Sequence, residues 1–295
     1  MQKEYFEEIP LKGKYINLDY MNLEKGFVMD FHCHKGFEIN QIVSGEGTLL
    51  IEDSIYEIKN DSIYIINALD LHKTNLNPDI PYLRTGLSFF PEYLIKFFDS
   101  GQVCELLSFF YTVTIKKHSK VPLDRGSYTR INNILKNMHE ETEHKDSKDD
   151  LLIALKLMEI LIIIYRAYEK SDVTLHKTGN PLISDGKINK ILDYINQYLI
   201  EGITLEKLEK ELNLSRYYIC HVFKDKTGFT VIEYMLNRKI AEAKRLLLNT
   251  NRTITEIAHY LSFCDAPYFS RTFKKIVGLS PQSYRASASI AILNP

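Results

Sequence analysis

The sequence has few features of chains that depend on disulfides, metal ribbons or repetitive structure. Its four cysteines, Cys33, Cys104, Cys220 and Cys264, lie far apart and form no C-x-x-C pair. Such isolated cysteines are typical of free thiols in a reducing compartment and argue against a disulfide or zinc framework. With only 13 Gly and 9 Pro in 295 residues, and 45% hydrophobic residues, a fibrous or globally disordered chain is also excluded.

Long hydrophobic runs are missing as well. The most apolar stretch, residues 151–168, is interrupted by Lys156, Glu159 and Arg166, so no run is long enough to cross a bilayer. The N-terminus is acidic and has no apolar core of the kind a signal peptide needs. We therefore expect a cytoplasmic protein with no membrane partner, divided at this length into two or three domains.

The formal net charge of −1 hides an uneven distribution. Residues 187–285 contain 16 Lys and Arg against 10 Asp and Glu, whereas the rest contains 21 against 28. A basic segment joined to an acidic one indicates a nucleic-acid-facing module attached to a part that does not face nucleic acid. A surplus this small also arises by chance, so the charge alone leaves both interpretations open.

The first hundred residues have a β pattern. Short runs rich in Ile, Val, Tyr and Phe are separated by turn residues, with no helix-length segment between them: Glu38–Val43, Thr48–Ile51, Ile55–Ile58 and Ile63–Ile66. Closely spaced short strands favour an antiparallel sandwich or barrel. From about Pro91 the pattern becomes helical.

Two helix-length segments follow, Arg130–Glu143 and Leu151–Tyr168. The second is apolar on nearly every side, which means burial on more than one face. Either it is buried within its own domain or it is shared with a partner subunit in a homodimer. The next segment, 171–186, is polar and contains Gly179, Pro181 and Gly186, so it is predicted to be a linker.

The C-terminal hundred residues contain an internal repeat at a shift of 50. The segment 215–230 is similar to 265–280, and Tyr, Phe, Lys and Gly recur at equivalent positions: Tyr218 and Tyr268, Phe223 and Phe273, Lys224 and Lys274, Gly228 and Gly278. In each copy an N-cap residue, Ser215 or Asp265, opens a helix, and a glycine closes it. The phenylalanines follow the apolar face and are predicted to be core.

A short amphipathic helix precedes each copy, over Leu205–Leu212 and over Ile254–Leu261. Helix, tight turn and capped second helix form the pattern of a helix-turn-helix motif. A long helix, Val231–Leu248, joins the two motifs, with Lys239, Lys244 and Arg245 on its expected polar side.

With these motifs the region 187–285 resembles the DNA-binding domain of AraC/XylS-type transcriptional regulators. The residues that carry the resemblance are Ser215, Phe223-Lys224, Gly228, Tyr234, Arg238, Ala243, Leu246-Leu247, Thr250, Ile254, Glu256-Ile257-Ala258, Phe263, Asp265, Tyr268-Phe269-Ser270-Arg271, Phe273-Lys274-Lys275, Gly278, Ser280-Pro281 and Tyr284-Arg285. Ser262 departs from the family, which usually has Gly there, and a non-Gly residue is expected to strain that turn.

The resemblance implies which side chains contact DNA. They are Arg216, Tyr217, Cys220, His221 and Lys224 in the first motif, and Ala266, Pro267, Arg271, Lys274 and Lys275 in the second. Arg271 is the strongest candidate, since a guanidinium can grip guanine or phosphate with two hydrogen bonds. Cys220 stands where relatives often carry a longer polar side chain. For His221, an exposed helical histidine without a role is the alternative.

The β region resembles a cupin jelly-roll barrel, the sensor fold of many such regulators. The spacing of Gly26, His32, His34, Glu38 and Gly45 is that of the first cupin motif, and His72 lies where the second motif has its histidine. The fold implies that His32, His34, Glu38 and His72 lie inside the barrel.

Two interpretations of these four residues remain. Three imidazoles and a carboxylate suit a divalent metal such as Zn, Ni, Mn or Fe. Alternatively they face a small-molecule effector or are hydrogen-bonded within the barrel, because the second motif departs from metal cupins at Asn67, Leu69 and Leu76. No cofactor is required for the second interpretation.

The sequence thus predicts an α+β protein with four parts. They are a cupin-like effector-sensing barrel (1–105), a helical connector and dimerisation segment (106–170), a linker (171–186), and an all-α domain with two helix-turn-helix motifs (187–290). The expected function is sequence-specific binding to double-stranded DNA, controlled by a carbohydrate or other metabolite, with RNA polymerase as a further partner. A metal-dependent cupin enzyme is the alternative, but such an enzyme has no need of the C-terminal repeat, and no nucleophile–base pair is visible.

Overall fold

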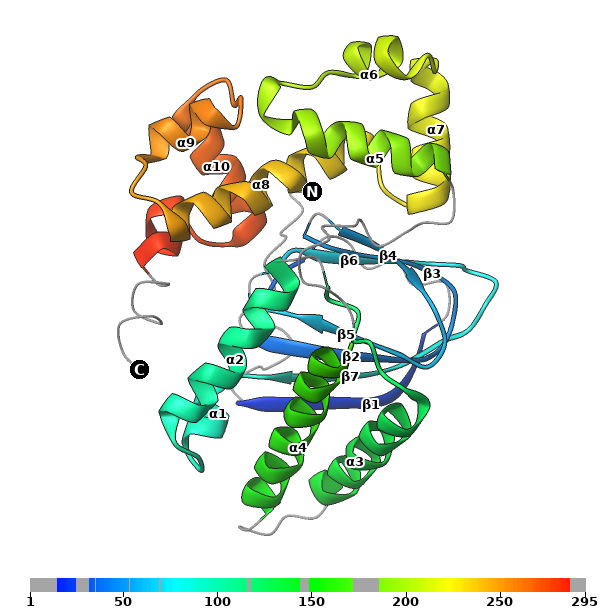
Figure 1. Ribbon diagram of the computed structural model, residues 1–295, viewed down its shortest axis with the longest axis vertical. Helices are drawn as coiled ribbons and strands as arrows, with labels where there is room; N and C mark the ends of the chain where they lie inside the picture. The colour runs from blue at the N-terminus through cyan, green and yellow to red at the C-terminus, as the bar shows by residue number, and fades with distance from the viewer. Residues whose placement is uncertain are drawn as a thin grey trace.

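The computed structural model describes residues 15–24, 32–34, 36–52, 54–68, 70–115, 118–143, 149–171 and 186–286. Two antiparallel sheets face each other, with helices on the outer side of each (Figure 1). The expected linker is outside this set except for Ser171 and Gly186, as are Gly26 and Leu69.

The strands form one sheet of four, in the order β1-β7-β2-β5, and one of three, in the order β4-β3-β6. Their bounds are β1 Ile16–Glu24, β2 Phe37–Ser44, β3 Gly47–Ile51, β4 Ser54–Ile58, β5 Ser62–Ile66, β6 His72–Leu76 and β7 Tyr82–Phe89. The four strands predicted from the sequence are confirmed to within one residue. An isolated bridge between His32 and His72 extends the three-stranded sheet beyond β6.

Alternation along the strands divides the apolar side chains among three cores. Ile42 and Tyr64 point between the sheets, into the barrel interior. Ile39 and neighbouring residues of the four-stranded sheet pack against the helices that follow the barrel. Leu50 and Ile55 of the three-stranded sheet point outward and pack with the C-terminal helices. Both sheets are therefore covered on both faces.

Four helices cover the four-stranded sheet: α1 Pro91–Ile95, α2 Ser100–Ile115, α3 Arg125–Glu143 and α4 Asp149–Lys170. Helix α3 begins five residues before the predicted start, and α4 extends two residues beyond the prediction at each end. Helix α2 runs across the expected domain boundary at 105/106, and these helices share one core with the sheet. The domain boundaries stay predictions.

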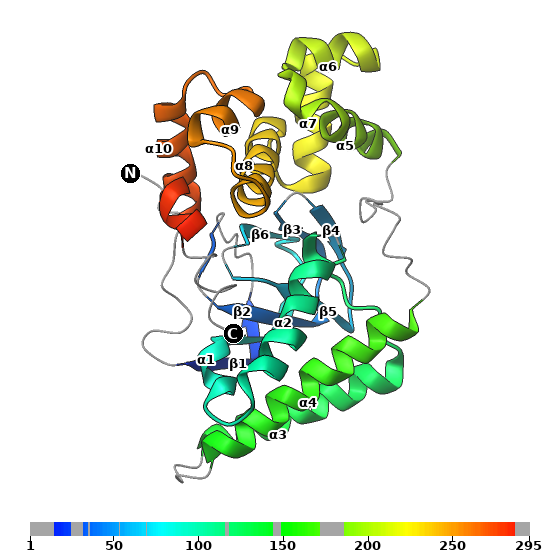
Figure 2. The ribbon, with the colours of Figure 1, turned by 60° about the vertical axis from the view of Figure 1, so that its left-hand side comes forward.

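The C-terminal helices lie on the opposite side, over the three-stranded sheet (Figure 2). Their bounds are α5 Gly186–Tyr198, the 3-10 turn Leu199–Glu201, α6 Leu205–Leu212, α7 Arg216–Thr227, α8 Val231–Asn249, α9 Ile254–Tyr260 and α10 Ala266–Val277. Both views show α8 between α5–α7 and α9–α10. Among the described helices none is long and apolar enough to cross a membrane.

Candidate nucleic-acid interface and effector site

The two recognition helices, α7 and α10, begin and end as the sequence predicts. Ser215 accepts a hydrogen bond from Tyr218 N, and Asp265 accepts one from Tyr268 N. These side chains satisfy free N–H groups at the helix starts. Gly228 and Gly278 end the helices with φ of 76° and 79°, in the left-handed region that favours glycine. The repeat is thus a structural repeat of two helix-turn-helix motifs.

The predicted DNA-contacting side chains lie on the surface of these helices. Tyr217 is 78% exposed, and its ring lies 5.7 Å from that of His221. Cys220 and Ala266 are half-buried, and all the others are exposed. Phe223, Phe269 and Phe273 are fully buried, as predicted for core residues. Each recognition helix therefore packs its phenylalanines into the core and exposes polar and aromatic side chains to the solvent.

The arginines of the two motifs differ in their partners. Arg216 forms ion pairs with Glu206 and Glu209 of α6, at 3.0 and 3.5 Å. Arg271 has no ion pair or hydrogen bond within the described part of the chain. The second motif therefore offers its guanidinium without first breaking an internal contact.

Ser262 occupies the turn where the family usually has glycine, and its φ is 54°. The expected strain is therefore present, because a side chain is disfavoured in this region. Two hydrogen bonds hold the turn: Ser262 Oγ donates to Ile200 O, and Lys239 Nζ donates to Ser262 O. Lys239 thus supports the second motif from α8.

One expectation for α8 is wrong. Lys244 was expected on a polar, solvent-facing side, but only 5% of it is exposed. Its Nζ donates to Glu52 Oε1 of the barrel at 2.5 Å. The side of α8 that carries Lys244 faces the sensor sheet, so a lysine in an otherwise helical pattern does not by itself mark the solvent.

The structure brings the four predicted effector or metal residues together. His32, His34 and His72 each offer a ring nitrogen, and these atoms all lie within 4.8 Å of one another. Glu38 of β2 reaches them across the barrel, with its Oε2 3.0 Å from His34 Nε2 and 3.8 Å from His72 Nε2. All four residues are buried.

The hydrogen bonds determine where the histidine protons lie. His72 Nδ1 is 2.9 Å from the Asp70 carbonyl oxygen, which can only accept, so Nδ1 carries the proton and Nε2 has a free lone pair. His34 Nε2 donates to Glu38 in the same way, and His34 Nδ1 is buried with no hydrogen-bond partner among the described residues. The unprotonated Nε2 of His72 therefore lies within the cluster, 3.8 Å from the Glu38 carboxylate.

Burial and charge set the ionisation of the cluster. Burial, with His32 and His34 close by, holds the pKa of His72 well below its ordinary value. Burial alone would raise the pKa of Glu38, but His34, His72 and Arg84 outweigh it and hold that pKa below its ordinary range. A neutral imidazole beside a carboxylate is the ligand form that a divalent cation needs, so the residues present fit such an ion.

Two further polar residues in the barrel were missed by sequence reasoning. Asn40 follows Glu38 on the same face of β2, and within the described part of the chain its buried Oδ1 has no hydrogen-bond partner. Arg84 of β7 lies close enough to Glu38 to help hold its charge and pairs with Glu24 at 3.1 Å. The alternation along β2 is a signal that could have found Asn40, because Glu38, Asn40 and Ile42 share a face.

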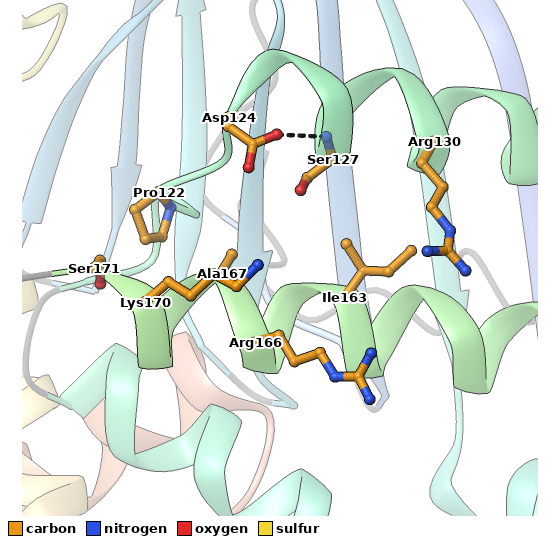
Figure 3. Close-up of a pocket in the computed structure, with 9 residues that line it drawn as sticks. All are labelled: Pro122, Asp124, Ser127, Arg130, Ile163, Arg166, Ala167, Lys170 and Ser171. Carbon is orange, nitrogen blue, oxygen red and sulfur yellow. Dashed lines mark hydrogen bonds between the residues drawn. The ribbon is translucent and has the colours of Figure 1, made fainter.

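A separate pocket of about 330 Å³ lies on the outer helices, and its lining includes none of the clustered histidines (Figure 3). It is formed by the start of α3 and the end of α4 and carries Arg130, Arg166 and Lys170. Its acidic member, Asp124, accepts a hydrogen bond from Ser127 N at the start of α3. The pocket is therefore predominantly basic.

Comparisons with known proteins identify a family for the barrel and a family for the C-terminal helices. The model of the AraC-like ligand binding domain family matches residues 24–161, and that of a helix-turn-helix domain family matches residues 208–287. The chain therefore belongs to the AraC/XylS family of transcriptional regulators, with a cupin-like ligand-binding domain ahead of its helix-turn-helix domain.

Individual relatives are more distant. An uncharacterized HTH-type transcriptional regulator of Staphylococcus aureus is 26% identical over 270 residues, which are 90% of this chain and 34% of that relative. This chain thus spans about a third of its length. The HTH-type transcriptional regulator YdiP of Escherichia coli is 34% identical over 42% of this chain and 41% of its own. The solved C-terminal domain of AraT, a response regulator from Geobacillus stearothermophilus, is 31% identical, covering 35% of this chain and 86% of that one, with a TM-score of 0.34.

Proposed function

We propose that α7 and α10 bind successive major grooves of one DNA duplex. We also propose that the protein acts in the cytoplasm, where that DNA lies. The exposed candidate residues at the outer surface of the two capped helices carry the proposal on DNA binding. Ala266 and Pro267 stand in the first turn of α10, where a recognition helix meets base edges, and Lys224, Lys274 and Lys275 in later turns suit phosphates.

Selection of duplexes from a random pool, followed by a mobility-shift titration, tests this function. We expect one recurrent sequence and a clear preference for it over the unselected pool. Equal affinity for both would contradict sequence-specific recognition.

We propose that the barrel interior binds a small hydroxylated metabolite of the carbohydrate class. The buried polar groups that line it, among them Asn40 Oδ1 and the Glu38 carboxylate, suit the hydroxyls of such a ligand. A thermal-shift screen of sugars tests this, with Asn40→Leu to remove the response. Gln41→Leu is the matched control, since Gln41 bonds Asn132 of α3 instead. A screen in which no sugar stabilises the protein contradicts the carbohydrate class.

A divalent cation is the second candidate occupant, favoured by the three ring nitrogens within 4.8 Å. His32, His34 and His72 would hold it, with Glu38 as a further oxygen ligand or hydrogen-bond partner. Such an ion would supply a fixed positive charge that can orient an anionic or hydroxylated effector. Metal analysis of the purified protein tests this candidate directly.

We propose a homodimer through α4. Its outer face carries exposed Leu151, Leu155 and Ile162. This stripe continues to Arg166 and Lys170 at the pocket (Figure 3), whereas exposed Asp150 lies in the first turn of the helix. Two copies of α4 packed antiparallel across a two-fold axis would join the apolar stripes and place the acidic end of one against the basic end of the other.

Sedimentation of the full chain at micromolar concentration tests the dimer, and a clean monomer contradicts it. Such a dimer would place two DNA-binding domains on one duplex, which would raise the effective affinity for DNA. We propose that the bound dimer changes initiation by RNA polymerase, which transcription in vitro from a selected site measures.

A further inference from the structure

Polar contacts connect the sensor barrel to the DNA-binding domain, and three of them carry the argument. Thr48 Oγ1 donates to Thr227 O at 2.7 Å, and Cys33 Sγ donates to Ile276 O at 3.3 Å. The third is the Glu52–Lys244 ion pair. Cys33 is fully buried and Thr48 is buried, and the outward-facing Leu50, Ile55 and Leu71 form one core with the C-terminal helices around them. The two domains are thus docked over an interface with both apolar and polar contacts.

Two of these contacts fall in the last turns of the two recognition helices. Thr227 is the last residue of α7, and Ile276 is the last but one of α10. The final carbonyl groups of a helix have no partner within the helix. Barrel side chains supply donors to one such carbonyl in each recognition helix, and Lys244 anchors the helix between them. The barrel therefore supplies hydrogen-bond donors at the C-terminal ends of both recognition helices, whereas the predicted base contacts of Ala266 and Pro267 lie at the start of α10.

A buried ion pair and an unusual backbone conformation at Glu52 also contribute to the interface between the barrel and α8. Burial would lower the pKa of Lys244, but Glu52, with Asp70 close by, holds it above its ordinary value, so the lysine stays charged at the interface. Glu52 has a φ of 53°, unusual for a residue with a side chain. It keeps this conformation because its N–H donates to Leu71 O and its carboxylate accepts from Leu71 N.

Two of these interface residues are neighbours of the histidine cluster in sequence. Cys33 stands between His32 and His34, and Leu71 precedes His72. The backbone of His32 exchanges two hydrogen bonds with that of His72, at 2.9 and 3.1 Å. Any ligand that draws the three imidazoles together also fixes the backbone that carries Cys33 and Leu71.

We propose that the barrel holds both helix-turn-helix motifs in one orientation through a three-point clamp of Thr48, Cys33 and Glu52, and that a cation bound at His32, His34 and His72 tightens it. The first part stands on the interface alone, and the second rests on the proposed cation site. The ten predicted DNA-contacting residues are exposed or half-buried in the docked state, so the clamp orients the DNA-binding surface without covering it. Fixing the two helices before binding reduces the entropy lost on DNA.

Cys33 reports whether the clamp is closed. Its thiol is fully buried, whereas Cys264 is exposed. Alkylation of the full chain with iodoacetamide, read peptide by peptide in a mass spectrometer, measures the opening of the interface against an internal standard. We expect Cys33 to be labelled far more slowly than Cys264 in the wild-type protein.

The clamp variants are Lys244→Met and Thr48→Val, which remove a charge and a hydroxyl while keeping much of the shape. Labelling of Cys33 should rise at least about tenfold in Lys244→Met and less in Thr48→Val. It should stay at the wild-type rate in Thr48→Ser, which keeps the hydroxyl. Arg245→Met is the control on α8, since Arg245 is exposed and pairs with Glu242. Wild-type labelling in both Lys244→Met and Thr48→Val would overturn the clamp.

The DNA arm uses a duplex selected from a random pool by the wild-type protein. We expect both clamp variants to bind it at least about threefold more weakly, since orientation is lost. Increased labelling together with unchanged or tighter DNA binding would overturn the orienting role. Circular dichroism confirms that each variant is folded, and Thr48→Val keeps the test decisive if Lys244→Met unfolds.

The cation arm adds one equivalent of zinc to Lys244→Met. We expect Cys33 labelling to fall towards the wild-type rate, and to be insensitive to zinc when His72→Ala is added. Zinc binding by calorimetry without a change in labelling would overturn the coupling. Absence of zinc binding would overturn both the coupling and the proposed cation site. The clamp itself would then be tested by the labelling of the variants without metal.

Discussion

Arg216, the first residue of α7, is held by Glu206 of α6, with 3.0 Å between Nη1 and Oε1. Glu209 adds a second ion pair and accepts a hydrogen bond from Arg216 N. The acidic side chains of α6 therefore fix the start of the first recognition helix. In the second motif Arg271 stands one turn further along its helix and has no such partner within the described residues. The two motifs of this regulator thus differ in how readily their arginines reach DNA.

We predict that Arg271→Ala weakens specific DNA binding by about 1–3 kcal/mol, because a guanidinium contact with guanine is worth this much. Arg216→Ala should cost less, since Arg216 must first leave an exposed pair that itself contributes roughly 0–1 kcal/mol. Titrations of both variants at several salt concentrations measure the difference. Wild-type affinity and salt dependence for Arg271→Ala would show that this residue does not contact DNA.

The caps of the two short helices α6 and α9 predict different stabilities. Thr253 and Glu256 form a full capping box, whereas Thr204 caps α6 alone because Lys207 stands three residues later. Thr253→Ala should lower the free energy of unfolding by about 1 kcal/mol. Thr204→Ala should cost less, since its hydrogen bond to Lys207 N is long at 3.3 Å. Urea unfolding of the full chain compares them, and equal losses would contradict the prediction.

The dimer model predicts the effect of charges on α4. Leu155→Asp and Ile162→Asp place carboxylates in the exposed apolar stripe, so we expect dissociation at micromolar concentration, measured by sedimentation. Both side chains are partly exposed, at 48% and 37%, so the monomers should remain folded. A folded dimer in both variants would move the interface elsewhere, and misfolding would mean that the helix is core.

Charge reversal tests the direction of the α4 pair. Asp150→Lys should weaken the dimer, because an antiparallel partner brings its basic end, with Lys170, to the same place. Adding Lys170→Asp to that variant should restore the dimer. Each exposed pair contributes at most about 1 kcal/mol, so the dissociation constant should change no more than about fivefold for each pair. Failure of the double variant to recover would favour a parallel pair or another surface.

Zinc should stabilise the wild-type protein and not His34→Ala. A ligand that binds only the folded state adds about 2.7 kcal/mol of stability at a concentration of one hundred times its dissociation constant. His139→Ala is a suitable control, because this histidine stacks on Tyr20 outside the cluster. Thermal unfolding with and without zinc gives the shift, and equal shifts in the wild type and His34→Ala would place the binding elsewhere.

Local patterns in the sequence predicted most of the fold. Strands β2 to β5 follow from alternating apolar residues between turn residues, and the recognition helices from caps such as Ser215 and Asp265. These patterns depend on residues only a few positions apart, so they can be recognised without knowledge of the overall fold. Local spacing also relates His32 to Glu38, because they lie within β2 and the segment before it. His72 joins them from β6 through a backbone bridge to His32, and it was placed only by the resemblance to a cupin barrel.

Contacts between distant parts of the chain could not be predicted in this way. Glu52 and Lys244 are 192 positions apart, and nothing near either residue indicates a partner. Lys244 fits the polar side of an amphipathic helix, and only the barrel beneath it makes that side an interface. Arg84 was missed for the same reason, because its position beside Glu38 depends on the pairing of β7 with β2.

The outward-facing Leu50, Ile55 and Leu71 have a consequence for how the protein is made. Synthesis proceeds from the N-terminus, so the three-stranded sheet leaves the ribosome long before α8 and α10, which cover it. Until then its outer face is an apolar β surface open to other chains. The C-terminal helices that cover this sheet are therefore synthesised last. A nascent chain that stops before α10 leaves the apolar face exposed, so it needs protection by chaperones.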